Sequence, residues 1–181
     1  MSLRNIHLLG SPVLRQPSEH VAKVDDQVRA FVADLFETMD FSKGVGLAAN
    51  QVGVAKRIAV VGIGEGERYA LINPVIVERE GSVKEEEGCL SIPDIYGDVE
   101  RSARVVVEAL DERGTRRRIE GTALLARALQ HEIDHLDGIL FIDRVGPFKR
   151  RSLVRQWEKS RKGKTGFIKE SIAEPEGADQ A

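Results

Sequence analysis

The sequence contains a single cysteine, Cys89, and has no long apolar run. A lone cysteine cannot form a disulfide within the chain, which is typical of proteins from a reducing compartment. The first twenty residues lack the apolar segment of a secretory signal, and no stretch has the length and composition of a membrane span. We therefore expect a cytoplasmic protein with no membrane partner.

Charge is nearly balanced along the chain as a whole. The 181 residues include 27 Lys and Arg against 29 Asp and Glu, so the formal net charge of −2 neither favours nor excludes a nucleic-acid partner. A chain of this length can bury roughly 70% of its unfolded surface without disulfides. We expect one catalytic domain over residues 1–169 and a disordered acidic tail over residues 170–181, which hold few apolar side chains.

A basic segment precedes that tail. Residues 149–164 include eight Lys and Arg and a single acid, Glu158. The apolar residues Leu153, Val154 and Trp157 predict that this segment is a helix. Two interpretations stay open, a solvated helix face or a docking surface for RNA, the ribosome or another anionic partner. Sequence-specific recognition of nucleic acid is not expected.

Hydrophobic periodicity predicts the other elements. Asp25 can cap a helix whose apolar residues run from Val28 to Met39. Residues 57–63 and 69–77 are expected to form a hairpin around glycines, and residues 105–110 and 116–119 a second strand pair. Helices before and after such pairs predict an α+β fold. Mostly antiparallel sheets would pack around a central metal-binding helix, with an N-terminal helix and a C-terminal helix.

The central helix carries the sequence His131-Glu132-Ile133-Asp134-His135. Histidines four residues apart lie on one helical face and can bind one metal ion, and Glu132 is placed as the general base of a metallohydrolase. Cys89 is the best candidate for a third ligand, which would leave a fourth position open for water. The alternative is an amphipathic helix with two partly exposed histidines. Arg127 is expected on the surface, between two stripes of side chains.

Residues 44–51 form a glycine-rich stretch, Gly-Val-Gly-Leu-Ala-Ala-Asn-Gln. No Gly-Lys-Ser/Thr follows and no third glycine has dinucleotide spacing, so a nucleotide site is not expected. The amide of Gln51 could donate to a developing oxyanion. Taken alone, Gln51 could equally be an ordinary polar residue of a loop or strand edge.

Three segments together resemble the peptide deformylase family. They are the complete motifs from Gly44 to Gln51, from Glu87 to Ser91 and from His131 to His135, in the family's order and spacing. The flanks are similar too, from about Leu8 through Asp143. The resemblance implies an enzyme that hydrolyses the formyl group from the N-terminal formylmethionine of nascent peptides and releases formate. It also implies one divalent metal, most often Fe²⁺, with Ni²⁺, Co²⁺ or Zn²⁺ as substitutes.

The same resemblance implies a role for each matching residue. Cys89, His131 and His135 would hold the metal, and Glu132 would be the acid/base. The Gln51 amide and the backbone N–H of Leu90 would stabilise the oxyanion. Two further sets would bind substrate: the backbone at Gly46 and Gly88 as partners of an added strand, and a methionine pocket shaped by Val45, Glu87, Leu124 and Ala128.

Two other functions remain open at this point. A metallopeptidase of the general His-Glu-x-x-His type would take a third histidine or an acidic ligand, and His7 and His20 are the only other histidines. A metal-stabilised scaffold that binds RNA or the ribosome would need neither Glu132 nor Gln51. The deformylase motifs favour the hydrolase.

Overall fold

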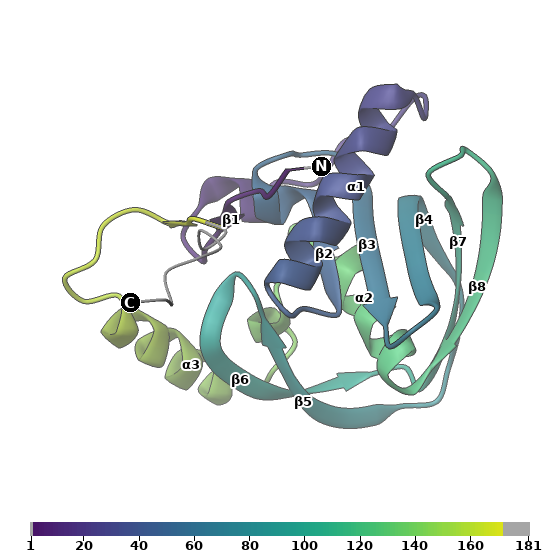
Figure 1. Cartoon of the computed structure of the whole chain (residues 1–181). Helices are drawn as coiled ribbons and strands as arrows, with labels where there is room; N and C mark the ends of the chain where they lie inside the picture. Colours follow the sequence, from purple (N-terminus) through teal and green to yellow (C-terminus); the bar gives the residue numbers. More distant parts are fainter. Residues whose placement is uncertain (1, 172–181) are drawn as a thin grey trace, which may run out of the picture.

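The computed structural model describes residues 2–171 and shows an α+β arrangement of helices and antiparallel sheets (Figure 1). Five strands form the main sheet, in the order β2-β3-β4-β7-β8. Two further strand pairs are β5 with β6 and β1 with β9. The helices are α1 (Asp26–Phe41), α2 (Ala123–Leu136) and α3 (Pro147–Ser160). The strands are β1 (Ile6–His7), β2 (Gly46–Ala48), β3 (Ile58–Ile63), β4 (Glu67–Glu80), β5 (Val83–Cys89), β6 (Ile92–Arg101), β7 (Arg104–Leu110), β8 (Arg116–Thr122) and β9 (Ile168–Lys169).

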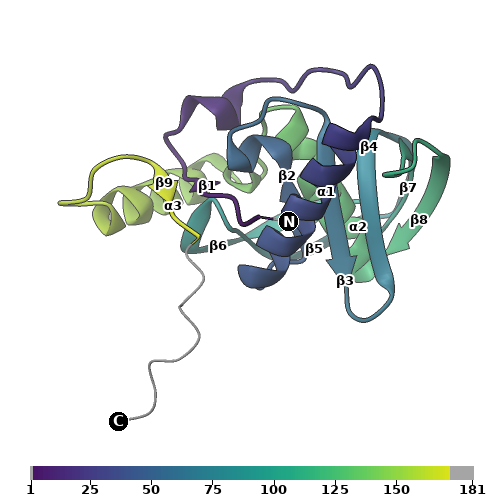
Figure 2. The same ribbon diagram turned by 45° about the horizontal axis from the view of Figure 1, so that its top comes forward.

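The main sheet is covered by α1 on one face and by α2 on the other. Successive residues of β3 belong to two different clusters, because side chains alternate across a strand. Ile58 and Val60 pack with the α1 side chains, whereas Ala59 and Val61 pack with the α2 side chains. Figure 2 shows α1 lying across the front of β3. Burial on both faces makes this part of the sheet a rigid support for α2.

The Asp25 cap predicted for the first helix is confirmed, and the two ends of α2 have features of their own. The Asp25 side chain accepts a hydrogen bond from Val28 N at 2.9 Å, which starts α1. Thr122 occupies the N-cap position of α2, although its side chain makes no capping bond. Gly138 follows the C-cap residue of α2 with a φ of +74°, a conformation that favours glycine.

The hairpin of β5 and β6 was not predicted from the sequence. Its first strand holds three consecutive glutamates, residues of low strand propensity. From Asp94 to Arg101 of β6, buried positions alternate with exposed ones: Ile95, Gly97 and Val99 are buried, and Asp94, Tyr96 and Asp98 are exposed. The hairpin turns at Leu90 and Ser91, and Cys89 at the end of β5 lies beside His135 of α2.

The basic segment forms α3, as predicted. Leu153 and Trp157 are buried in a third cluster with Ile92, Ile95 and Val99. Within residues 2–171, no helix is long and apolar enough to cross a membrane. The expected disordered tail lies almost wholly outside the described residues, and the single catalytic domain over 1–169 stays a prediction.

We predict that Gly138→Ala destabilises the fold by about 3 kcal/mol, because it adds a left-handed backbone penalty to a steric overlap. A Cβ at this position would lie 2.7 Å from the carbonyl oxygen of Arg15. The matched control is Gly163→Ala, which has a similar φ of +79° but no heavy atom within 4 Å of the added Cβ. It should lose about 1 kcal/mol. Urea unfolding measures both, and equal losses would show that the overlap is relieved at no cost.

Candidate active site

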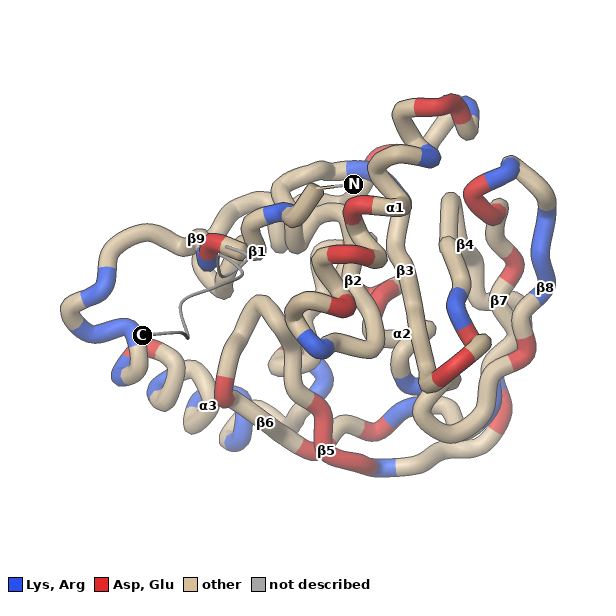
Figure 3. The backbone as a smooth tube through the Cα atoms, in the orientation of Figure 1, with Lys and Arg blue, Asp and Glu red and all other residues tan. Residues whose placement is uncertain are grey.

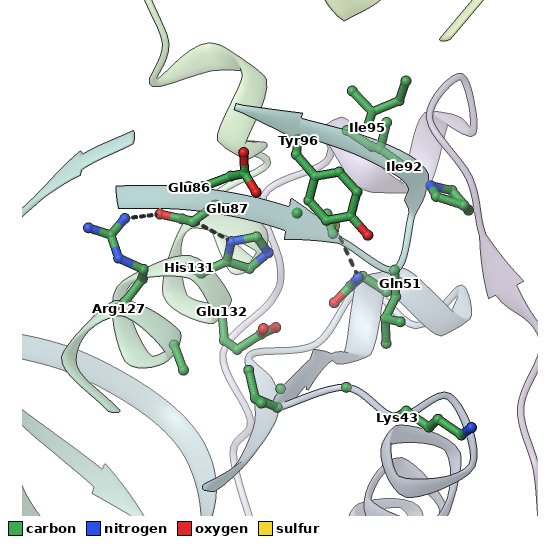
Figure 4. A pocket seen from close by; sticks show the side chains of 18 of the residues that line it. Lys43, Gln51, Glu86, Glu87, Ile92, Ile95, Tyr96, Arg127, His131 and Glu132 are labelled. Atoms are coloured by element: carbon green, nitrogen blue, oxygen red, sulfur yellow. Dashed lines mark hydrogen bonds and ion pairs between the residues drawn. The ribbon is translucent and has the colours of Figure 1, made fainter. Parts of the chain in front are cut away.

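A cavity of about 410 Å³ brings the three sequence motifs together. One wall is the segment around β2, the opposite wall is the β5–β6 hairpin, and α2 closes one side, at the left of Figure 4. The motif residues that line it are Gly44, Val45, Gly46, Gln51, Glu87, Gly88, Cys89, Leu90, His131 and Glu132. Leu124 and Ala128 line it as well. Segments more than 80 positions apart in the sequence therefore meet at one site.

Cys89, His131 and His135 form a compact cluster of metal-ligand types. Their ligand atoms all lie within 4.8 Å of one another. The Nε2 atoms of the two histidines are 3.1 Å apart, and the Cys89 Sγ atom is 3.4 Å from His135 Nε2. The helical spacing of four residues brings the two rings to one face, as the sequence predicted.

The cluster fits a divalent transition metal by its chemistry. One thiolate and two imidazoles are borderline-soft donors that suit zinc, iron, nickel and cobalt. Burial and the neighbouring His131 hold the pKa of His135 well below its ordinary value, which favours the neutral form that coordinates metals. Three protein ligands leave an open position, the arrangement of a catalytic site.

Glu87 fixes the orientation of His131. The Nδ1 atom of His131 lies 2.8 Å from Glu87 Oε1, which leaves Nε2 directed at the cluster. Arg101 Nε and Arg127 Nη1 each lie 2.6 Å from Glu87 Oε2. Burial opposes ionisation of Glu87, but the hydrogen bonds from His131 and Arg101 outweigh it and lower the pKa to about 2. Its carboxylate is therefore charged and fully engaged.

The prediction that Arg127 lies on the surface was wrong. Its side chain is buried, and besides Glu87 it donates to the carbonyl oxygens of Val99 and Val83 at 3.0 and 3.1 Å. The sequence signal was available, because a charged residue between two apolar stripes of a central helix requires a buried partner. The partner was the glutamate at the start of the Glu-Gly-Cys motif.

A second carboxylate extends this network. Asp134 Oδ2 accepts from Arg101 Nη1 at 2.8 Å, and Asp134 Oδ1 accepts from Arg144 Nη2 at 2.8 Å. Asp134 thus links the helix that carries the histidines to β6 and to the segment before α3. It is a hydrogen-bonding partner of the network and does not belong to the ligand cluster.

Glu132 points into the cavity beside Gly46. A Cβ on Gly46 would overlap the Glu132 carboxylate, so only glycine leaves room for it. The Oε2 atom of Glu132 is buried and has no hydrogen-bond partner among the described residues. Burial is the main reason why its pKa is raised to about 7. A carboxyl group of this kind can accept and release a proton near neutral pH.

The amide of Gln51 is held in one orientation. Its Oε1 accepts from Ala48 N at 2.9 Å, and its Nε2 lies 3.1 Å from Ser91 Oγ and 3.6 Å from Cys89 Sγ. The amide N–H groups therefore face the ligand cluster (Figure 4).

Asn50 was not predicted as a site residue. It is fully buried, and its Nδ2 atom lies 2.5 Å from the carbonyl oxygen of His135. This bond ties the segment after β2 to the last turn of α2. The type of residue at position 50 carried no signal for this contact.

The expected substrate residues lie where a peptide could reach them. β2 is an edge strand of the main sheet, since Gly46 pairs only with Val61 of β3. β5 pairs only with β6, so two strand edges flank the cavity. Val45 and Leu124 are 42% and 47% exposed and line the cavity with the buried Ala128. Their roles, and that of Glu87 in a methionine pocket, stay predictions.

The chain resembles known proteins over most of its length. Residues 3–151 match the family described as polypeptide deformylase. The chain is 49% identical to the peptide deformylase of Acetivibrio thermocellus over 168 residues, which covers 86% of this chain and 98% of that protein. It is 46% identical to the peptide deformylase of Acidobacterium capsulatum over 163 residues, covering 88% and 96%.

Solved structures show the same fold. The peptide deformylase of Legionella pneumophila superimposes with a TM-score of 0.85 at 40% identity, over 89% of this chain and 96% of that one. The peptide deformylase of Ehrlichia chaffeensis, crystallised in complex with actinonin, also gives 0.85 at 41% identity, over 88% and 98%. With these matches over most of the sequence and fold, the chain belongs to the polypeptide deformylase family.

Proposed function

We propose that this protein hydrolyses the formyl group from the N-terminal formylmethionine of newly made polypeptides and releases formate. The observation that carries the proposal is that the cluster of Cys89, His131 and His135 lies beside Glu132 and Gln51. All of these except the buried His135 line one cavity. A structural metal site would need neither a buried carboxyl group beside the cluster nor an amide aimed at it. Membership of the deformylase family supports the same reaction.

The metal ligands in this proposal are Cys89, His131 and His135. A divalent metal bound there lowers the pKa of a water molecule and polarises the formyl carbonyl. We propose Fe²⁺ as the metal in the cell, the usual metal of the family, with Zn²⁺, Ni²⁺ or Co²⁺ able to replace it. The donor set suits all four and does not choose among them.

Glu132 moves the proton. Its carboxylate takes a proton from the attacking water as the water oxygen bonds to the formyl carbon. It then delivers that proton to the methionine nitrogen as the carbon–nitrogen bond breaks, which leaves formate and a free amine. The absence of a hydrogen bond at Glu132 Oε2 among the described residues supports this role, because that oxygen faces no competing donor.

Gln51 and Leu90 stabilise the charge that develops on the formyl oxygen. The Gln51 Nε2 group already faces the cluster, and the backbone N–H of Leu90 follows directly after the Cys89 ligand. One such donor typically contributes about 3 kcal/mol to the transition state. The contacts of Gln51 with Ala48 and Ser91 keep its amide aligned before substrate arrives.

The peptide binds by adding a strand between the edges of β2 and β5. The backbone at Gly46 and Gly88 provides donors and acceptors for this pairing, and such main-chain bonds tolerate many peptide sequences. Val45, Leu124 and Ala128 offer an apolar surface for the methionine side chain. Glu87 lines the same cavity, but its engagement with His131 supports a positioning role for its carboxylate.

The structure does not favour a metallopeptidase with a third histidine ligand. His7 bonds Ser11 Oγ through Nδ1 at 2.7 Å, and His20 lies beside Asn73. Within residues 2–171, neither histidine belongs to a cluster of metal-ligand types.

The basic face of α3 is proposed as a docking surface for the ribosome, which would place the enzyme in the cytoplasm beside its substrate. Arg151, Arg155 and Lys159 line a shallow groove with Phe148, whose side chain is 83% exposed. Figure 3 shows basic residues along this helix. Such a cluster suits a polyanion without sequence preference.

The first test compares acyl groups on one peptide. We expect formyl-Met-Ala to be cleaved with a kcat/KM at least about 100-fold above that of acetyl-Met-Ala, with the metal held constant. The extra methyl makes the attacked carbon less electrophilic and crowds it against Glu132 and Gln51. Release of formate or acetate is measured directly. Equal rates would favour a broader amidohydrolase over a deformylase.

The second test separates proton transfer from metal binding. Glu132→Gln should keep the metal and lose at least about 100-fold in kcat, because an amide cannot shuttle a proton. Cys89→Ala should lose both, and Glu112→Gln in the exposed β7–β8 turn should lose neither. Metal content is measured by elemental analysis beside formate release. Near-normal turnover in Glu132→Gln would show that a group other than Glu132 transfers the proton.

The third test concerns docking. Reversing Arg151 and Arg155 to Glu should weaken ribosome binding at least about tenfold at low salt while formate release from formyl-Met-Ala is kept. The control reverses Arg113 in the distant β7–β8 turn and Arg116 at the start of β8. Sedimentation with ribosomes over a salt series measures binding. Binding that responds equally to both pairs would contradict a specific role for α3.

A further inference from the structure

A second cavity of about 310 Å³ adjoins the active-site cavity. It lies between the end of α3, β9 and the first residues of β6. Pro93, Asp94 and Lys169 line both cavities, so one opens beside the other. The three shared residues form the boundary between the two cavities.

One wall of this second cavity is the C-terminal arm, which we define as residues 161–171. The arm is fixed to the rest of the fold: Leu8 N donates to Phe167 O at 2.7 Å, and Ile6 pairs with Lys169. Arg161 Nη2 donates to Gly166 O at 2.5 Å. The arm lies beyond residue 151, where the match to the family ends. This wall is therefore formed outside the matched part of the chain.

The lining of the second cavity combines an apolar base with a basic rim. Leu8 and Trp157 are buried side chains at its base. Arg161, Lys164 and Lys169 supply three positive charges against the single negative charge of Asp94. Among residues 2–171, Lys164, Lys169 and Asp94 form no salt bridge. Within the described part of the chain, neither lysine is paired with a carboxylate, so both can contribute to a basic rim.

We propose that this second cavity is a subsite for the part of the polypeptide that follows the formylmethionine, and that it prefers acidic residues there. The inference rests on the proposed function. A formylated substrate has no residue before its methionine, so the rest of the chain can leave the active site in only one direction. An extended peptide advances about 3.3 Å per residue, which brings positions a few residues after the methionine within reach.

The test uses two formylated pentapeptides, formyl-Met-Ala followed by three glutamates and formyl-Met-Ala followed by three lysines. The readout is the ratio of kcat/KM for the acidic peptide to that for the basic one. In the unaltered full-length protein we expect a ratio of about five or more at low salt, falling toward one as salt screens the contacts. Lys164→Glu with Lys169→Glu should invert the preference.

Lys162→Glu is the matched control, because Lys162 is exposed and lines neither cavity. It should leave the ratio as in the unaltered protein. A ratio near one, or a ratio that Lys162→Glu changes as much as the double reversal does, overturns the subsite. Formate release from formyl-Met-Ala by the unaltered protein is measured in the same series. Its absence would instead count against the proposed function.

Discussion

The hydrogen bond between Glu87 and His131 Nδ1 joins the β5–β6 hairpin to helix α2 at the candidate active site. Glu87 belongs to the β5–β6 hairpin, and His131 belongs to the helix that packs on the main sheet. With Nδ1 committed to the carboxylate, the Nε2 atom of His131 is left to face the ligand cluster. The orientation of His131, a proposed metal ligand, thus depends on a contact from the β5–β6 hairpin.

This bond holds because the carboxylate is surrounded by positive charge. Arg101 and Arg127 approach Glu87 from β6 and from α2, and all three side chains are at most 6% exposed. A buried pair of this kind adds little net stability, but loss of one partner leaves an uncompensated charge and costs about 3–5 kcal/mol. The network therefore fixes the relative position of hairpin and helix more than it raises the overall free energy of unfolding.

The spacing of the Glu-Gly-Cys motif matches the spacing of the two histidines. Residues two apart on a strand share a face and are roughly 6.6 Å apart, and residues four apart on a helix are separated by about one turn of 5.4 Å. These two distances are similar, and Glu87 meets His131 while Cys89 meets His135. The pairing of β5 with β6 shifts register between Glu87 and Cys89, so the match does not require a regular strand. Gly88, between them, faces the other way, and a Cβ there would lie 2.6 Å from the Tyr96 ring.

Much of this arrangement could be predicted from the sequence, and the failures have physical causes. Apolar periodicity was enough for α1, α2 and α3 and for the strand pairs β3–β4 and β7–β8. It failed at β5, where the buried position is held by Glu87 and stabilised by ion pairs, so no hydrophobic pattern exists. The same cause led to the wrong placement of Arg127.

The three ligand types could be proposed from spacing, but their supporting residues could not. Asn50 holds the backbone of His135 and Ser91 holds the amide of Gln51, and both act through tertiary contacts that no local pattern records. The C-terminal arm is a similar case, because β9 has two residues and pairs with β1 at the other end of the chain. A strand pair of two residues is stabilised by the tertiary surface on which it packs, and it leaves no periodic pattern in the sequence.

The position of Glu132 explains why the first motif has a glycine at residue 46. The acid/base proposed here must stay buried enough for its pKa to rise, yet remain beside the open position of the metal site. The main sheet meets this requirement at Gly46, where the missing side chain leaves the space that the Glu132 carboxyl group fills. A larger residue at position 46 would overlap this carboxyl group and displace it. The position of the Glu132 carboxyl group is therefore set jointly by Gly46 of β2 and by the packing of α2 on the main sheet. The proposed acid/base depends on the first motif as well as on Glu132.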